Sequence, residues 1–178
     1  YTDEGSPGRD WNVATGMVIE GKAGFQIMGD WAKGEFTAAG KTPGVDYYCA
    51  ATPSNNGYLY NVDSFIFYKS SDPDKQAGQK LLAKLMMGKN FQKVFNLYKG
   101  SIPARLDVSM DEFDKCAKTS NADIKTAGAS GGLVPSFAHG MAQGNTMKAA
   151  LQDIITEHFN SDMSCLLYTS DAADEMRR

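Results

Sequence analysis

Apolar and polar residues recur along the chain in patterns that predict six helices. In these stretches the apolar side chains follow helical spacing, or a capping residue opens the stretch. The predicted helices cover residues 11–21, 31–39, 73–87, 91–97, 109–118 and 146–159. Asp10 opens the first, and Asp72 before Pro73 opens the third. Ser109 with Glu112 forms a capping box for the fifth.

Two of these helices are predicted to be clearly amphipathic, with one face turned toward a core. The expected buried stripe of the third consists of Ala77, Leu81, Leu82, Leu85 and Met86. The expected apolar face of the sixth consists of Met147, Ala150, Leu151, Ile154, Ile155 and Phe159.

Three short apolar runs predict strands between the helices. They are residues 24–28, 47–52 and 58–68, and the last two are rich in aromatic and β-branched side chains. Residues 53–57 (PSNNG) have turn chemistry, and residues 128–132 form a glycine-dense loop that leads past Pro135 to His139. This order of helices and strands predicts an α/β fold.

Composition narrows the class of protein. The chain has 178 residues, of which 42% are hydrophobic and 22% charged, so it can bury a core and is not a disordered segment. The net charge of −3 leaves no basic surface for phosphates, which argues against nucleic-acid binding. We find no apolar run of the ~20 residues that a membrane-spanning helix needs.

The two ends of the chain do not resemble natural ends. The sequence starts at Tyr1 rather than at a methionine, so the lack of a signal peptide in it carries no information. Residues 165–175 (CLLYTSDAADE) continue neither the period nor the composition of the last helix, and they resemble a translated sequencing adapter. We therefore expect one native segment over residues 1–164 and a non-native tail over residues 165–178.

The cysteines leave two possibilities open. The chain has three, and Cys49 and Cys116 remain once Cys165 is assigned to the tail. An even number is compatible with one disulfide in an oxidising compartment, and equally with two buried free thiols.

Standard catalytic and cofactor motifs are missing from the sequence, and no cofactor or metal is predicted. What remains is a small set of residues at places where the chain turns. Trp11 and Trp31 begin two helices, where an indole can fill a core or stack on a sugar ring. Asp63 interrupts an apolar run, where a charge needs a partner or a ligand. Lys99 and His139 lie near glycine turns, where solvated or hydrogen-bonded side chains are also common.

Several segments together resemble a known family, the extracellular solute-binding proteins of carbohydrate ABC transporters, in particular the branch that binds glucose or related monosaccharides. The segments MGDW and KGSIP are fairly specific for it, and the likeness extends over nearly all of residues 8–164. The matching segments are GRDWNVATGMVIEGKAGFQIMGDWAKGEFTAAGKTPGVDYYC, NVDSFIFYK, NLYKGSIPAR, EFDKCAK and VPSFAHGMA.

The resemblance implies a fold and a set of site residues. The fold would be the type II periplasmic-binding-protein-like fold with two lobes, of which this chain is mostly the C-terminal lobe. Trp11 and Trp31 would form aromatic walls of the sugar site. Asp63, Lys99 and His139 would supply polar contacts to the ring hydroxyls.

The implied activity is capture of a monosaccharide between two lobes and its delivery to the permease subunits, in the periplasm or at the outer face of the membrane. The alternative from another class is a glycoside hydrolase, which needs two carboxylates around the glycosidic bond. Only Asp63 is out of place, since Asp30 and Glu35 fit a helix start and a helix surface. A carbohydrate-binding module, usually a β-sandwich, does not fit so many helices. We therefore expect no enzyme.

The non-native tail can be tested on nucleotides. If residues 165–175 derive from an adapter, the source codons of CLLYTSDAADE will match the adapter sequence in the corresponding frame. Sequencing the same locus from an independently prepared library checks this, because a genuine coding region would reappear there unchanged.

Overall fold

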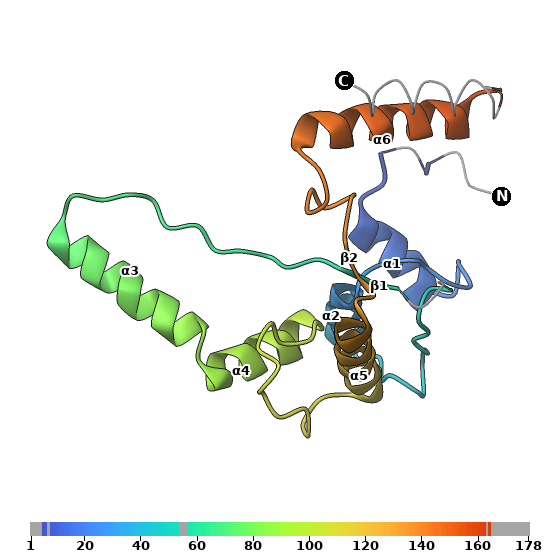
Figure 1. The fold of residues 1–178 in the computed structure, drawn as a ribbon. Coiled ribbons are helices and arrows are strands. Elements are labelled where there is room, and N and C mark those ends of the chain that lie inside the picture. The colour runs from blue at the N-terminus through green and yellow to red at the C-terminus, as the bar shows by residue number, and fades with distance from the viewer. Residues whose placement is uncertain (1–4, 7, 54–56, 163, 165–178) are drawn as a thin grey trace.

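The computed structural model describes residues 5–6, 8–53, 57–162 and 164, and helices dominate it (Figure 1). The predicted turn at residues 53–57 lies partly, and the proposed tail at residues 165–178 entirely, outside these residues. In chain order the elements are α1 (Trp11–Ile19), the 3-10 helix η1 (Asp30–Ala32), α2 (Lys33–Ala38), β1 (Tyr58–Tyr60), α3 (Pro73–Met86), α4 (Lys89–Lys99), α5 (Lys115–Ser130), β2 (Leu133–Pro135) and α6 (Asn145–Asn160). The content is mixed, as an α/β class requires.

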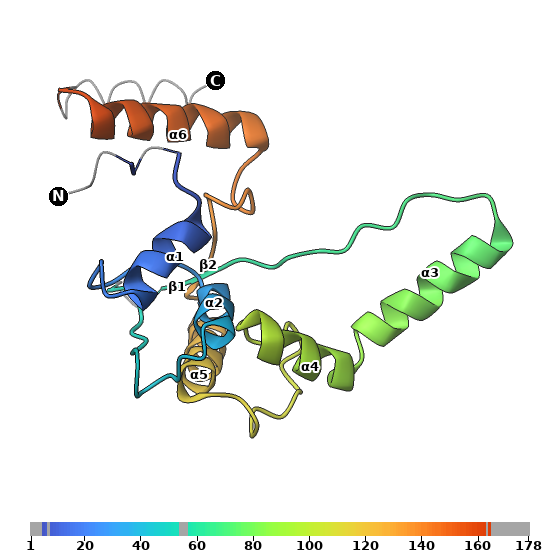
Figure 2. The same ribbon diagram turned by 180° about the vertical axis from the view of Figure 1, so that it is seen from behind.

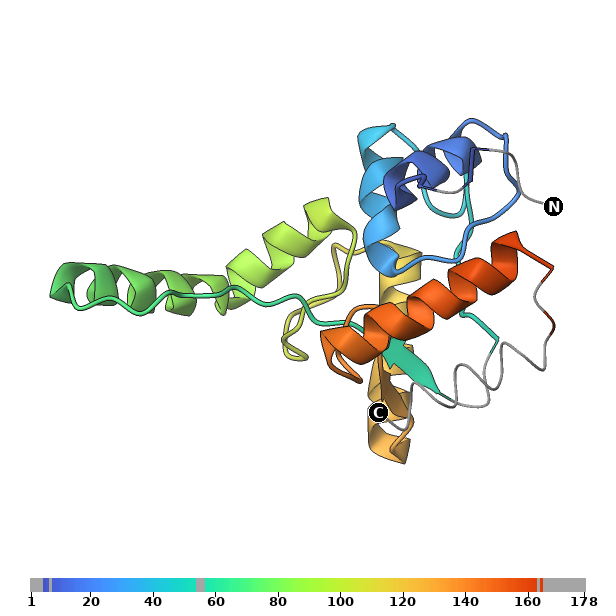
Figure 3. The ribbon, with the colours of Figure 1, turned by 90° about the horizontal axis from the view of Figure 1, so that it is seen from above.

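The two strands pair in parallel at the centre of the molecule. Tyr58 lies opposite Leu133, and Tyr60 lies opposite Pro135. Parallel strands need a long connection, and here the chain between them contains α3, α4 and α5. Helices α1, α2 and α5 lie around the strand pair, whereas α3 and the extended segment before it reach far away from the centre (Figures 1 and 2). Seen from above, α6 crosses over the strands on the side away from most of α5 (Figures 1 and 3).

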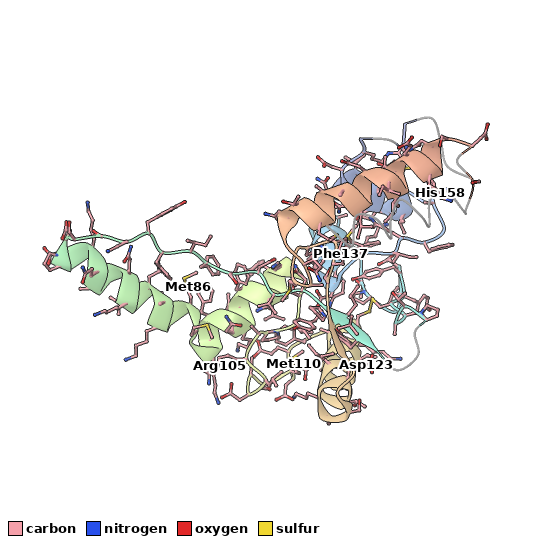
Figure 4. The ribbon with its side chains drawn as sticks, turned by 45° about the horizontal axis from the view of Figure 1, so that its top comes forward. Met86, Arg105, Met110, Asp123, Phe137 and His158 are labelled. Atoms are coloured by element: carbon pink, nitrogen blue, oxygen red, sulfur yellow. A yellow bond between two sulfur atoms is a disulfide. The ribbon has the colours of Figure 1, made fainter. Side chains whose placement is uncertain are left out.

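Most of the predicted helices are confirmed, because their start and stop signals are local. The carboxylate of Asp72 accepts hydrogen bonds from Asp74 N at 2.9 Å and Lys75 N at 3.3 Å and so caps α3. Gly100 ends α4 in the left-handed conformation with φ 86°, which glycine adopts without steric cost. Figure 4 shows Met86 where α3 meets α4.

The predicted capping box at Ser109 is wrong. Ser109 Oγ donates to the carboxylate of Asp111 at 2.7 Å, and Lys93 Nζ donates to Glu112 Oε1 at 2.7 Å. Both side chains of the box therefore have other partners, and residues 109–114 form turns instead of a helix.

Helix α5 starts six residues later than predicted and continues further. Asp114 caps it by accepting from Ala117 N at 2.8 Å. The helix extends to Ser130 through part of the segment predicted to be a glycine loop, and Gly131 ends it at φ 73°. A helix tolerates the single Gly128 in its interior at a modest cost.

The strand predictions are mostly wrong. Residues 24–28 and 47–52 form no strand, and of residues 58–68 only Tyr58–Tyr60 pairs. A single extended segment is not stable by itself, because its backbone groups need a neighbouring strand to bond to. Among the described residues, no segment pairs as a strand with these runs beyond Tyr58–Tyr60. Large apolar side chains on them are consequently exposed, among them Phe25 at 82% and Ile66 at 79%.

The predicted buried stripe on α3 is also largely wrong, since Leu81, Leu82 and Leu85 are exposed and only Met86 is buried among the large side chains of that stripe. Helix α3 contacts α4 near their junction and otherwise extends away from the centre (Figure 2). Within the described residues, α6 likewise buries none of its side chains. These two helices form where predicted, but their apolar faces have few neighbours.

Two glycines allow α2 and the end of α4 to touch through their backbones. A Cβ on Gly34 would lie 2.8 Å from the carbonyl oxygen of Lys99, and one on Gly100 would lie 2.6 Å from Gly34 N. Beside this contact Lys33 is buried, and its Nζ donates to Asp114 Oδ2 at 2.8 Å. The contact and the ion pair join α2, α4 and the start of α5 at one place.

A disulfide links Cys49 to Cys116, with their Cα atoms 5.7 Å apart. Of the two possibilities that the cysteine count left open, the structure has the bonded one. The bond attaches the irregular segment around residue 49 to the first turn of α5.

We expect loss of this disulfide to destabilise the fold. Replacing both residues, as Cys49→Ser with Cys116→Ser, should lower the free energy of unfolding by about 2–4 kcal/mol, because the bond closes a long loop in the unfolded chain. Denaturant unfolding with and without reductant measures this. The control is the double variant, on which reductant should have no comparable effect; equal midpoints for the oxidised wild type and the variant would contradict the prediction.

Candidate functional site

One large open cavity, of ≈1540 Å³, lies against the centre of the molecule. Its lining comes from η1, residues 47–52, β1 and the segment after it, one face of α4 and one face of α5. This is more than the ~300–1,000 Å³ of a small-molecule pocket, because exposed apolar side chains of the unpaired runs also border it. Three of the predicted site residues line it: Trp31, Asp63 and Lys99.

Asp63 and Lys99 form an ion pair across the cavity wall. Lys99 Nζ donates to Asp63 Oδ2, and Asn61 Nδ2 donates to Asp63 Oδ1 at 3.2 Å. The hydrogen bond from Lys99 holds the pKa of Asp63 below its ordinary value, with help from the Lys99 charge and Asn61 and against partial burial. The Asp63 side chain is 62% exposed, compared with 29% for Lys99, so the carboxylate stays ionised and accessible.

The lysine is positioned by the last turn of α4. Its Nζ lies 5.8 Å from the centre of the Phe95 ring, one helical turn earlier, within the range of a cation–π contact. Phe95 also lines the cavity and so places an apolar ring beside the ion pair.

His139 joins this group from the loop after β2. The centres of the His139 and Trp31 rings are 5.2 Å apart, with the rings nearly perpendicular at 80°. His139 Nδ1 shares a hydrogen bond of 2.7 Å with Ser136 Oγ, and the His139 charge contributes to the lowered pKa of Asp63. The structure therefore brings together Trp31, Asp63, Lys99 and His139 from four separate segments. His139 does not itself line the cavity and joins the group through its ring contact with Trp31.

Trp31 requires the glycine two residues before it. A Cβ on Gly29 would lie 2.1 Å from the Trp31 ring, so only glycine leaves room for the indole in this position. The GDW order of residues 29–31 thus has a steric reason.

Trp11 stands apart from the other four. It begins α1, is 40% exposed and is not among the residues that line the cavity. Its carbonyl oxygen accepts from Gln26 Nε2 at 3.0 Å, and Gln26 does border the cavity. The described structure therefore connects Trp11 to the site only through Gln26.

Sequence reasoning missed two polar residues of the site. Asn61 supports Asp63, and its spacing of two residues in an extended segment was the available signal. Asp30 lines the cavity next to Trp31 and accepts a hydrogen bond from Ile102 N at 2.9 Å. Its position before a helix explained it adequately in the sequence, so nothing there indicated a partner 72 residues away.

Aromatic rings beside an ionised carboxylate and its lysine form a site suited to binding a small polar ligand. Within the described ranges, no group of three or more histidine, cysteine or acidic side chains could hold a metal ion. None of the described helices is long and apolar enough to cross a membrane.

The chain belongs to the family of bacterial extracellular solute-binding proteins, which matches residues 1–126. The family indicates a binding protein rather than the glycoside hydrolase considered above. It confirms the prediction of a solute-binding protein that is located outside the cytoplasm. Together with the mixed helix and strand content, it indicates a periplasmic-binding-protein-like fold.

Curated relatives agree with the family. A protein of Brucella suis named "Probable sugar-binding periplasmic protein" is 46% identical over 177 residues, which are 99% of this chain and 41% of the relative. One of the same name from Rhizobium meliloti is 44% identical over 92% of this chain and 40% of its own. An uncharacterized ABC transporter extracellular-binding protein of Pyrococcus horikoshii is 34% identical over 88% of this chain and 34% of its own. The chain spans about 40% of the first two relatives.

The Asp63–Lys99 pair should contribute little to folding. Because the Asp63 side chain is largely exposed, Asp63→Asn is expected to change the free energy of unfolding by less than about 1 kcal/mol. Denaturant unfolding of the variant beside the wild type measures this. A much larger loss would show that the pair supports the fold rather than a ligand.

Proposed function

We propose that the protein is the sugar-binding component of a carbohydrate ABC transporter, and that its ligand is glucose or a similar monosaccharide. The observation that carries the proposal is the convergence of Trp31, Asp63, Lys99 and His139 on one group beside the cavity. The names of the relatives, which include sugar-binding periplasmic proteins and an ABC transporter binding protein, support it.

The chemistry of the group suits a pyranose. The C–H face of a sugar ring is apolar and stacks on an aromatic ring, which Trp31 offers. The ionised Asp63 carboxylate can accept hydrogen bonds from two neighbouring hydroxyls, while its own position is fixed by Lys99 and Asn61. Lys99 has three donors and uses one on Asp63, so two remain for ligand oxygens.

Histidine adds a further polar contact. Because His139 Nδ1 is engaged with Ser136, only Nε2 is left for a hydroxyl of the ligand. Trp11 stays in the proposal as a second aromatic wall on the strength of the resemblance alone, since it neither lines the cavity nor, among the described contacts, joins the other four residues.

For the whole protein we propose the two-lobed mechanism of its family. This chain would supply most of the C-terminal lobe, and sugar bound between two lobes would favour the closed form by contacting both. The closed form would then be recognised by the membrane permease subunits in the periplasm. A choice among epimers follows from the same contacts, because a buried polar group left without a partner costs about 1–3 kcal/mol.

Calorimetric titration of the full-length protein encoded by the source gene with a panel of monosaccharides tests the proposal. We expect saturable binding of at least one sugar and no turnover of aryl glycosides. Asp63→Ala should weaken that binding at least about tenfold, because a charge-assisted hydrogen bond is lost.

The matched control is Asp107→Ala. Asp107 is also an exposed aspartate paired with a lysine, Lys89 at 3.0 Å, but it does not line the cavity. Asp107 also pairs with Arg105 at 2.7 Å, and Figure 4 labels Arg105 near the junction of α3 and α4. The proposal fails if no sugar of the panel binds, or if both substitutions change affinity equally.

A further inference from the structure

Asp30 is a carboxylate of the cavity lining to which neither the resemblance nor the comparisons give a role. It is half-buried at the start of η1, directly before Trp31. Its Oδ2 accepts from Ile102 N at 2.9 Å, in the turn that follows Lys99. The same carboxylate thus stands next to the aromatic wall in sequence and holds the lysine turn in space.

Asp30 has two lysine neighbours, and each of these lysines pairs with another aspartate. Lys33 and Lys99 both lie close enough to act on it, and each has another acidic partner, Asp114 for Lys33 and Asp63 for Lys99. Burial raises the pKa of Asp30, while the hydrogen bond from Ile102 and the two lysine charges lower it. An ordinary helix-start aspartate at a surface has neither this burial nor two lysine neighbours.

The backbone contact between Gly34 and Gly100 lies at the same turn. It leaves no space for a side chain on either glycine, so the chain at residue 100 rests directly on α2. That contact fixes the beginning of the turn, and Asp30 fixes it two residues later through Ile102. Lys99, the residue before the turn, thereby lies beside α2 and close to Asp30 of η1.

We propose that Asp30 is a positioning residue of the sugar site, which holds the turn of residues 100–102 so that the Lys99 ammonium stays on Asp63 beside Trp31. This inference rests on the proposed function. Asp30 acts through Lys99 and does not itself bind the ligand.

A double-mutant cycle on the full encoded polypeptide tests this role. Asp30→Ala should weaken binding of the sugar that binds best in the panel by about tenfold, through displacement of Lys99. In a Lys99→Met background the same substitution should weaken it by less than about threefold, because there is no ammonium left to position. Equal losses in the two backgrounds would overturn the proposal, since a general structural role acts in both.

Asp30→Asn separates the hydrogen bond from the charge. The amide keeps a side-chain oxygen for Ile102 N, so most of the affinity should be retained relative to Asp30→Ala. The same variant keeps the test informative if the alanine variant fails to fold, and thermal unfolding shows whether it does. An asparagine variant that folds and loses as much affinity as alanine would contradict positioning through the turn.

A second measurement does not depend on the sugar. Hydrogen–deuterium exchange of a peptide that contains Ile102 should be faster in Asp30→Ala and close to wild type in Asp30→Asn. Unchanged exchange in the alanine variant would overturn the role of Asp30 even if sugars bind. Absence of sugar binding by the wild type, with the expected change in exchange, would instead overturn the proposed function and leave the anchoring of the turn intact.

Discussion

The site depends on the direct backbone contact between α2 and the end of α4. Gly34 and Gly100 have no side chains, and any Cβ at either position would collide with the facing backbone. Because the helices meet so closely, the last turn of α4 is placed against η1, and Lys99 comes to lie near residues that precede it by about seventy positions. The buried Lys33–Asp114 pair adds α5 to the same junction. Without this contact the cavity would have no fixed wall.

The sequence predicts helices here far better than strands, and the reason is the range of the interactions involved. The cap of α3 by Asp72 and the end of α4 at Gly100 each depend on neighbours a few residues away. A strand needs a partner elsewhere in the chain. The apolar and aromatic side chains of residues 24–28 and 61–68 were therefore not sufficient to make these runs strands. The prediction of a capping box at Ser109 was wrong for a related reason, because Lys93 of another helix donates a hydrogen bond to the Glu112 carboxylate.

The same contrast applies to the site. Asp63 could be found in the sequence because a charge inside an apolar run is a local anomaly, and the structure gives it a partner in Lys99. The pairing itself, across 36 residues, was not visible. Asp30 was missed because its local explanation was adequate and its partner, the Ile102 amide, is distant. Trp11 shows the opposite case: its residue type suggested the site, but its described hydrogen bonds are to Thr15 and Gln26 and not to the other four residues.

The disulfide makes the shape of the cavity depend on the redox conditions under which the chain folds. Cys49 and Cys116 both belong to its lining, so the position of that wall depends on a bond that forms only where oxidants are present. A chain made and kept in a reducing cytosol would have the same sequence and the same local helix signals, but the segment around residue 49 would not be attached to α5. The shape of this surface therefore depends on whether the chain folded in an oxidising compartment.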